Sequence, residues 1–371
     1  MDEQLILSKA LKILQEGLDF PEALTFKIKP AAYLTKQRAP DLIFMVQVGP
    51  SFKKDRNKLK DFKNGVVETK LRGKVFIAEI KKLTQPRHLR NAIFYLKDIG
   101  KNYRNYYPLI IAPFIGPSGR ALCRREGVSY IDTLGNIGLF WKDGFIIKES
   151  RESIKSETRG LKSLFAIKST RVIRVILEEL FRSWKLQDLA NSSKVSLGQV
   201  YNVIKKLLDE EYVEKTKQGI KIIQPGKLLD DWVKYYKFTE FNTIDTFYSG
   251  ERNYHELLNN LARTAEMLNY TYAFTLFAAA SLVAPYVMTP FIHLYLVGDK
   301  DKFAQNANLK PVTSGGNVSI IRPYDEGILN TVKEINGLQV VGNIQLYLDL
   351  ICYPARGKEQ AEMLRGKVIG F

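Results

Sequence analysis

Two charged side chains lie at the end of a short apolar segment, and their spacing is one that could place them together in a catalytic site. The segment is KVFIAEIKKL, residues 74–83, and it carries Glu79 and Lys81. Because side chains alternate along a β-strand, both point to one face. A carboxylate and an ammonium placed this way belong either to a metal-binding nuclease centre or to a solvated ion pair, which contributes little to stability.

The flanking sequence predicts the elements that would hold this pair. Residues 1–152 alternate between helical and strand patterns, with Pro86 suited to the first turn of a helix. Strands mixed with helices predict an α/β packing. The expected order is helix 3–17, strands 24–29, 41–48 and 74–81, helix 86–102, strand 108–112, a helix from Pro117, and strands near 129–131 and 137–148.

Asp41 is a second candidate carboxylate in this region. It is the first residue of the expected strand DLIFMVQV and directly follows Pro40. These residues and the later pair spell PD…ExK, which, with the element order, resembles the restriction-endonuclease-like fold. The resemblance implies that Asp41 and Glu79 hold Mg²⁺ through carboxylate oxygens. It also implies that Lys81 orients a water or stabilises charge on the phosphate. The basic loop at 51–63 would then grip the nucleic-acid backbone.

Three interpretations of this segment stay open. The tripeptide ExK is common by chance in a lysine-rich chain, and Asp41 precedes Glu79 by 38 positions, a longer gap than the motif usually shows. The segment is therefore an active nuclease centre, an inactive nuclease-like fold that only binds, or a surface ion pair. A further acid, Asp132 in SYIDTLGNIG, either points into a cleft beside Asn136 or caps a turn, and the turn cap is favoured because that role is common for Asp.

The composition narrows the class of protein. The chain has 371 residues, 45% apolar and 26% charged, as in ordinary globular proteins, but its net charge is +17. Such a surplus favours a polyanionic partner, most often nucleic acid. The two cysteines lie far apart, which argues against a disulfide framework or a zinc ribbon and fits a reducing cytoplasm.

One long uncharged stretch, residues 272–298, has the length of a membrane span. Pro285 and Pro290 divide it, and polar side chains are scattered through it. We therefore expect a buried helix over about 273–284 and a buried strand over about 291–297, not a membrane segment.

A second segment, 153–225, begins with a charged linker and continues as three helices and a small hairpin. Its helical periodicity and the Ser196 N-cap position define the third helix. The pattern resembles a winged helix-turn-helix, and a winged helix used for protein contact is the alternative. The exposed side of the third helix would read base edges, and the hairpin lysines would contact phosphate. The predicted DNA-binding residues are Ser196, Gln199, Tyr201, Asn202, Lys205, Lys206, Lys215, Lys217 and Lys221.

The third segment, 226–371, contains neither a GxxxxGK[ST] loop nor an HExxH motif. Its stretches SGGNV and QLYLDL…PARGKEQAEMLR, in order after the three helices, resemble AbiEi-type antitoxins of type IV toxin–antitoxin systems. PLIIAPFIGPSGRALCRREGVSYIDTLGNIGL (108–139) resembles the region before the winged helix in that family. The resemblance implies a transcriptional regulator that represses its own operon and opposes a nucleotidyltransferase-like toxin.

The expectation is therefore an α/β multidomain protein of the cytoplasm with three parts. These are a restriction-endonuclease-like α/β domain (1–152), a winged helix-turn-helix (153–225) and a C-terminal mixed α/β domain (226–371). The predicted function is sequence-specific binding of double-stranded DNA without a cofactor. The alternative is a Mg²⁺-dependent endonuclease that uses Asp41, Glu79 and Lys81, and a protein-interaction scaffold is the third hypothesis.

Overall fold

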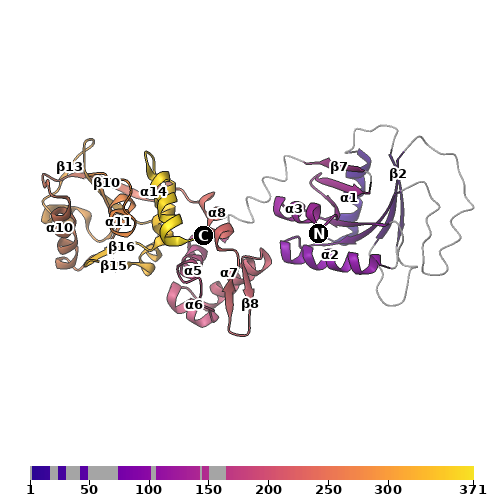
Figure 1. The fold of residues 1–371 in the computed structure, drawn as a ribbon, viewed down its shortest axis with the longest axis horizontal. Coiled ribbons are helices and arrows are strands. Elements are labelled where there is room, and N and C mark those ends of the chain that lie inside the picture. Colours follow the sequence, from indigo (N-terminus) through magenta and orange to yellow (C-terminus); the bar gives the residue numbers. More distant parts are fainter. Residues whose placement is uncertain are drawn as a thin grey trace, which may run out of the picture. The chain divides into compact units, whose positions relative to one another are not determined.

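The chain folds into two compact units, Met1–Leu161 and Lys162–Phe371. A computed structural model describes residues 2–16, 24–30, 42–48, 74–101, 106–142, 144–149 and 164–371. Within these ranges the protein is mixed α/β, as expected from the sequence (Figure 1).

The first unit is built on one seven-stranded sheet whose strands lie in chain order, β1 to β7. The pairs β3–β4 and β4–β5 are parallel and the other pairs are antiparallel. Each parallel pair is connected by a helix, as parallel strands require. The elements are α1 (Glu3–Glu16), β1 (Leu24–Pro30), β2 (Leu42–Val48), β3 (Lys74–Ile80), α2 (Pro86–Gly100), β4 (Tyr106–Ala112), α3 (Pro117–Arg125), β5 (Ser129–Asp132), β6 (Ile137–Trp141) and β7 (Gly144–Lys148).

Side-chain alternation along the central strands gives this sheet two buried faces. In β3, Phe76 and Ala78 pack in one apolar cluster with Ile6 of α1. Ile77 packs in a second cluster with Leu89 of α2. The helices therefore cover opposite faces, which explains why the central strands read as nearly continuous apolar runs.

The second unit begins with three helices and a two-stranded hairpin. Helix α5 is Ile167–Glu178, α6 is Leu186–Ser193 and α7 is Leu197–Asp209. The hairpin pairs β8 (Val213–Lys215) with β9 (Ile220–Ile222). Each helix turns an apolar stripe inward at the helical period, as the sequence predicts.

The rest of the second unit surrounds another seven-stranded sheet, in the order β13-β10-β14-β12-β11-β16-β15. Helix α13 packs on the face that carries His293 and Tyr295 of β12, where Tyr295 bonds to Asp349 of α13. The elements are α8 (Pro225–Val233), α9 (Phe238–Phe241), β10 (Thr243–Tyr248), α10 (Tyr254–Met267), β11 (Thr271–Thr275), α11 (Leu276–Val283), β12 (Ile292–Val297), α12 (Lys300–Asn306), β13 (Lys310–Pro311), β14 (Val318–Arg322), η1 (Glu326–Thr331), β15 (Lys333–Ile335), β16 (Leu338–Val340), α13 (Asn343–Ile351), α14 (Gly357–Leu364) and η2 (Arg365–Ile369).

The uncharged stretch at 272–298 differs in part from the expectation. A helix was predicted over about 273–284, but Thr271–Thr275 form strand β11 and the helix begins at Leu276. Strand β11 pairs with β12 on one side and with β16 on the other. These pairings with distant segments override the helical pattern, because a short apolar run suits a buried strand equally well. Among the described residues, no helix has the length and apolar character needed to cross a membrane.

One apolar core unites the three helices with the C-terminal sheet. It extends from Leu164 to Ile369 and includes Val172 of α5, Val203 of α7 and Leu346 of α13. Residues on both sides of position 225 therefore belong to one compact unit. The three-domain division, the restriction-endonuclease-like fold and the winged helix stay predictions.

Candidate nucleic-acid interface

Helix α7 begins at a capped N-terminus and buries one side. The Ser196 side chain accepts a hydrogen bond from the Gln199 backbone N–H at 3.3 Å, which satisfies one of the free donors of the first turn. Val200, Val203, Ile204 and Leu207 are buried. The backbone of α7 is thereby fixed against α5 and α6.

The opposite side of α7 is polar and open. Tyr201 is 57% exposed, Asn202 and Lys205 are exposed, and Gln199 is half-buried. Ser196 and Lys206 are exposed as well. All six residues predicted to lie on the open side of this helix therefore reach solvent, while their role in binding stays a prediction.

The hairpin carries the remaining predicted residues. Lys215, Lys217 and Lys221 are exposed and, within the described parts of the chain, form no ion pair or hydrogen bond through their ammonium groups. In the turn, the Thr216 hydroxyl donates to the carbonyl of Gly219 at 2.9 Å. These ammonium groups are consequently available to an anionic partner.

Gly219 and Trp184 anchor this hairpin to the helices. The backbone of Trp184 exchanges two 2.8 Å hydrogen bonds with Ile220. Gly219 has φ +141°, and a Cβ at this position would lie 2.5 Å from the Trp184 carbonyl oxygen. Only glycine combines this backbone conformation with so close an approach.

Sequence reasoning missed Lys194 on this surface. It is exposed in the turn between α6 and α7, with φ +52°. Its position between the helices LQDLANSS and LGQVYNVIKKLLD was the available signal. The residue adds positive charge next to the capped start of α7.

Helix α5 is tied to the C-terminal sheet by polar contacts as well as by the shared core. The Arg171 Nε atom lies 3.0 Å from both carboxylate oxygens of Asp325. Glu178 accepts from the Ile344 backbone N–H at 2.8 Å and pairs with Lys333 at 2.8 Å. These contacts hold the helix-and-hairpin surface in one orientation relative to the sheet.

Arg174 makes a buried connection from the same helix. Its side chain is fully buried and lies over the Trp232 ring, 5.4 Å from the ring centroid. Its Nε donates to Gln345 Oε1 at 3.1 Å. Gln345 in turn donates to Tyr236 at 2.9 Å and to Asp349 at 2.7 Å.

Asp349 is the centre of this buried network. Hydroxyl groups of Tyr236, Tyr295 and Thr275 donate to its carboxylate at 2.6, 3.1 and 2.5 Å. Burial raises the pKa of Asp349 to about 6, although these hydrogen bonds oppose the shift. The network thereby joins α13 to β11, to β12 and to the turn after α8.

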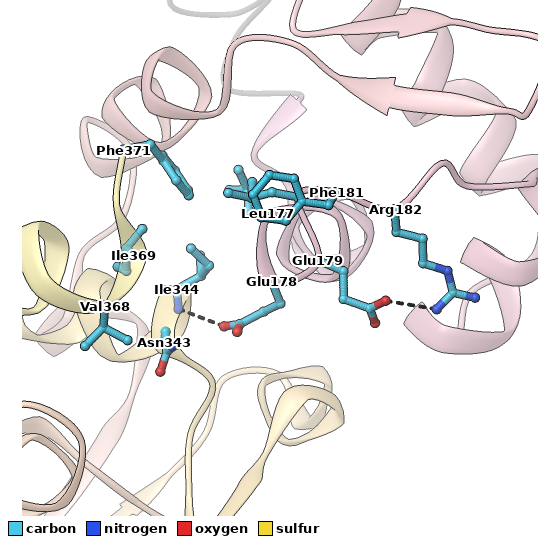
Figure 2. Close-up of a pocket in the computed structure, with 11 residues that line it drawn as sticks. Leu177, Glu178, Glu179, Phe181, Arg182, Asn343, Ile344, Val368, Ile369 and Phe371 are labelled. Atoms are coloured by element: carbon cyan, nitrogen blue, oxygen red, sulfur yellow. Dashed lines mark hydrogen bonds and ion pairs between the residues drawn. The ribbon is translucent and has the colours of Figure 1, made fainter.

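A cavity of about 410 Å³ lies beside α5 (Figure 2). Leu177, Ile344 and Phe371 contribute apolar surface, and Phe181 at its edge is 97% exposed. The nearby carboxylates are occupied, since Glu178 bonds to Ile344 and Glu179 pairs with Arg182 at 2.9 Å. Both carboxylates that line the cavity are therefore engaged in contacts within the second unit.

Glu79 and Lys81 do form the ion pair that their spacing suggests. Their Oε1 and Nζ atoms are 2.6 Å apart, and Glu79 is only 7% exposed. Asp41 and the basic loop at 51–63 lie outside the described residues. In the described ranges, no three His, Cys, Asp or Glu side chains gather as a metal site. Glu79 alone does not complete a Mg²⁺ site, which takes several oxygen ligands.

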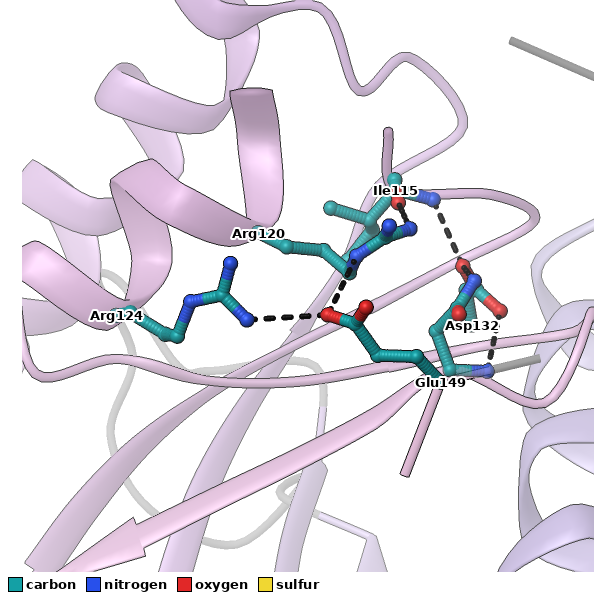
Figure 3. Close-up of polar contacts among 6 residues, drawn as sticks. Ile115, Arg120, Arg124, Asp132 and Glu149 are labelled. Carbon is teal, nitrogen blue, oxygen red and sulfur yellow. Dashed lines mark hydrogen bonds and ion pairs between the residues drawn. The ribbon is translucent and has the colours of Figure 1, made fainter. Parts of the chain in front are cut away.

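Asp132 caps a turn, as the sequence indicates (Figure 3). Its carboxylate accepts backbone N–H bonds from Ile115 and Leu134 at 2.9 Å, and the Asn136 side-chain amide at 2.7 Å. Burial raises its pKa, and these hydrogen bonds oppose that shift. Nearby, Arg120 and Arg124 both form ion pairs with the same carboxylate oxygen of Glu149. The cluster joins α3 to the sheet and leaves Asp132 no role in a cleft.

The fold and the surface define a mixed α/β protein that presents a polar helix and a lysine-bearing hairpin. Residues 221–370 match the model of a family described as "Transcriptional regulator, AbiEi antitoxin, Type IV TA system". The match covers less than half of the chain and lies within the second unit. No curated protein and no solved structure matches the chain.

Proposed function

We propose that the protein is a sequence-specific DNA-binding transcriptional regulator, the antitoxin of a type IV toxin–antitoxin system. The observation that carries the proposal is the exposed polar side of α7, next to a hairpin whose lysines have no described partners. The net charge of +17 and the family match at 221–370 support it independently.

In this proposal α5 to β9 form a winged helix-turn-helix with α7 in the major groove. Gln199 and Asn202 pair with adenine edges, and Lys205 and Lys206 contact guanine or phosphate. The hairpin lysines neutralise phosphates and fix the register without reading sequence. The Ser196 cap and the polar contacts of α5 hold these groups in place before DNA arrives.

The proposed setting is the cytoplasm, with double-stranded DNA and a nucleotidyltransferase-like toxin as the partners. The toxin partnership rests on the family description of residues 221–370. A neighbouring gene for such a toxin would support it. The regulator function is tested separately, on DNA alone.

The test is a salt titration of binding to operator and random DNA by two variants. Asn202→Ala removes a base contact, so the binding free energy for the operator should weaken by about 1–3 kcal/mol. The affinity for random DNA should stay unchanged. Lys215→Ala removes a phosphate contact, so affinity falls on both DNAs and the salt slope decreases by about 1.

Lys358→Ala is the matched control, because Lys358 is an exposed lysine on α14 and belongs to neither α7 nor the hairpin. It should leave both affinities unchanged. Equal losses on operator and random DNA for Asn202→Ala would contradict base reading by α7. A protein that shows no salt-dependent DNA binding at all would favour the scaffold hypothesis.

A second candidate function is a metal-dependent DNA endonuclease of the PD…ExK type, favoured by the close Glu79–Lys81 pair. In that reading Asp41 and Glu79 bind Mg²⁺, which would supply Lewis-acid chemistry. Supercoiled plasmid is incubated with the native chain and with Glu79→Ala and Lys81→Ala, in Mg²⁺ or Mn²⁺. Nicking that both substitutions abolish supports the nuclease; intact but gel-shifted DNA leaves regulation as the function.

A further inference from the structure

Among the described residues, the outer edge of β7 forms no hydrogen bonds to another strand. Strand β7 is the last strand of the seven-stranded sheet and pairs only with β6 among the described residues (Figure 1). No described residue makes a backbone hydrogen bond to its other side. Such an edge is a ready template for another strand.

This edge also displays apolar side chains. Phe145 is 68% exposed and Ile147 is 42% exposed, and both point to one face because they are two residues apart. Ile146, between them, points to the other face and packs against the core under α1. The strand contains no proline and one charged residue, Lys148, so its own sequence gives the edge little protection against pairing.

We propose that β7 pairs with β7 of a second copy of the chain, so that two sheets join across a two-fold axis. The sequence GFIIK is self-complementary in one antiparallel register, centred on Ile146. In that register Phe145 of each copy lies opposite Ile147 of the other, and the pair occurs twice. Aromatic and β-branched residues are favourable cross-strand partners.

Within the five residues of β7, the charges are compatible with this register. Lys148 lies opposite Gly144 of the other copy, so no like charges meet within the five residues. Glu149 is turned back to Arg120 and Arg124 of its own copy. A two-fold pairing uses the same residues from both copies and closes after two chains, which ends growth along this edge.

The association is tested on the full chain by sedimentation over a range of concentrations. The native protein should reach twice the mass of one chain. Phe145→Lys together with Ile147→Lys places ammonium groups opposite one another, and the dimer dissociation constant should rise by at least about tenfold. Both positions are exposed, so the fold should persist, which circular dichroism checks.

Phe94→Lys is the control, since Phe94 is an exposed aromatic residue on α2, 76% accessible. It should not change the dissociation constant. A native chain that stays monomeric at all concentrations overturns the proposal. A dimer that withstands the double substitution overturns it too, because it uses another surface.

Cysteine pairs test the register. Phe145→Cys mixed with Ile147→Cys should yield a cross-linked dimer on mild oxidation, because these positions face each other across the axis. Each variant alone should not cross-link, as the unsubstituted chain with its native Cys123 and Cys352 should not. Cross-linking by a single variant alone overturns the register centred on Ile146. Cross-linking only to added foreign peptides would assign the edge to a different partner.

Discussion

Two buried titratable side chains, Asp349 on helix α13 and His293 on strand β12, give the stability of the second unit opposite pH dependences. Burial raises the pKa of Asp349 to about 6, from an ordinary value near 3.8. Burial lowers the pKa of His293 to about 4, from an ordinary value near 6.5. Between pH 4 and 6 folded Asp349 therefore binds a proton that the unfolded chain lacks, whereas folded His293 lacks a proton that the unfolded chain binds.

These pKa shifts predict that replacing Asp349 and replacing His293 change the pH dependence of the free energy of unfolding in opposite directions. Acidification from pH 7 to 4 raises the free energy of unfolding through Asp349 and lowers it through His293, each by on the order of 1–3 kcal/mol. Urea unfolding of Asp349→Asn should lose stability on acidification relative to the native chain. His293→Gln should gain stability over the same range. Parallel pH profiles for all three proteins would contradict these assignments.

At the scale of elements, the attachment of the hairpin depends on one backbone conformation. Gly219 has φ +141° and approaches the backbone of Trp184, which is itself buried. This contact holds the strands that carry the predicted phosphate-binding lysines. The hairpin is therefore sensitive to any side chain at this turn.

Gly219→Ala should lower the free energy of unfolding by about 1–3 kcal/mol, because its Cβ would lie 2.5 Å from the Trp184 carbonyl oxygen. Gly198→Ala is the matched control. Gly198 lies in α7 with open space around it, and alanine favours a helix over glycine by up to about 1 kcal/mol. Thermal unfolding compares the two variants, and equal midpoints would argue against a tight contact at Gly219.

At the scale of the whole molecule, each apolar core consists of residues from only one of the two units. Both clusters of the first unit use residues between Ile6 and Ile146. The large cluster of the second unit uses residues between Leu164 and Phe371. Each unit therefore buries its own core from its own residues, the property expected of an independently folding domain.

Residues 162–371 produced alone should fold, with a melting midpoint within about 3 °C of a transition of the full chain. A second fragment, residues 226–371, loses α5 and with it the partners of Asp325 and Gln345. It should not unfold cooperatively in calorimetry. Cooperative unfolding of this shorter fragment would instead support the domain boundary at 225.

The sequence by itself determined most elements and the two sides of α7. Strands 74–80 and helix 86–100 lie where apolar alternation and Pro86 predicted them, and Ser196 does cap α7. The turn-capping role of Asp132 also followed from its local sequence. These features depend on neighbours within a few positions, which periodicity and capping patterns report directly.

Only the tertiary structure decided the features that depend on distant partners. The segment 271–275 became a strand through its pairing with β12 and β16. Arg174 meets Gln345 across 171 positions, and that contact helps join the helices of 164–224 to the C-terminal sheet. No local pattern encodes such contacts, because a buried arginine on a helix is stable only once folding supplies its hydrogen-bond partners.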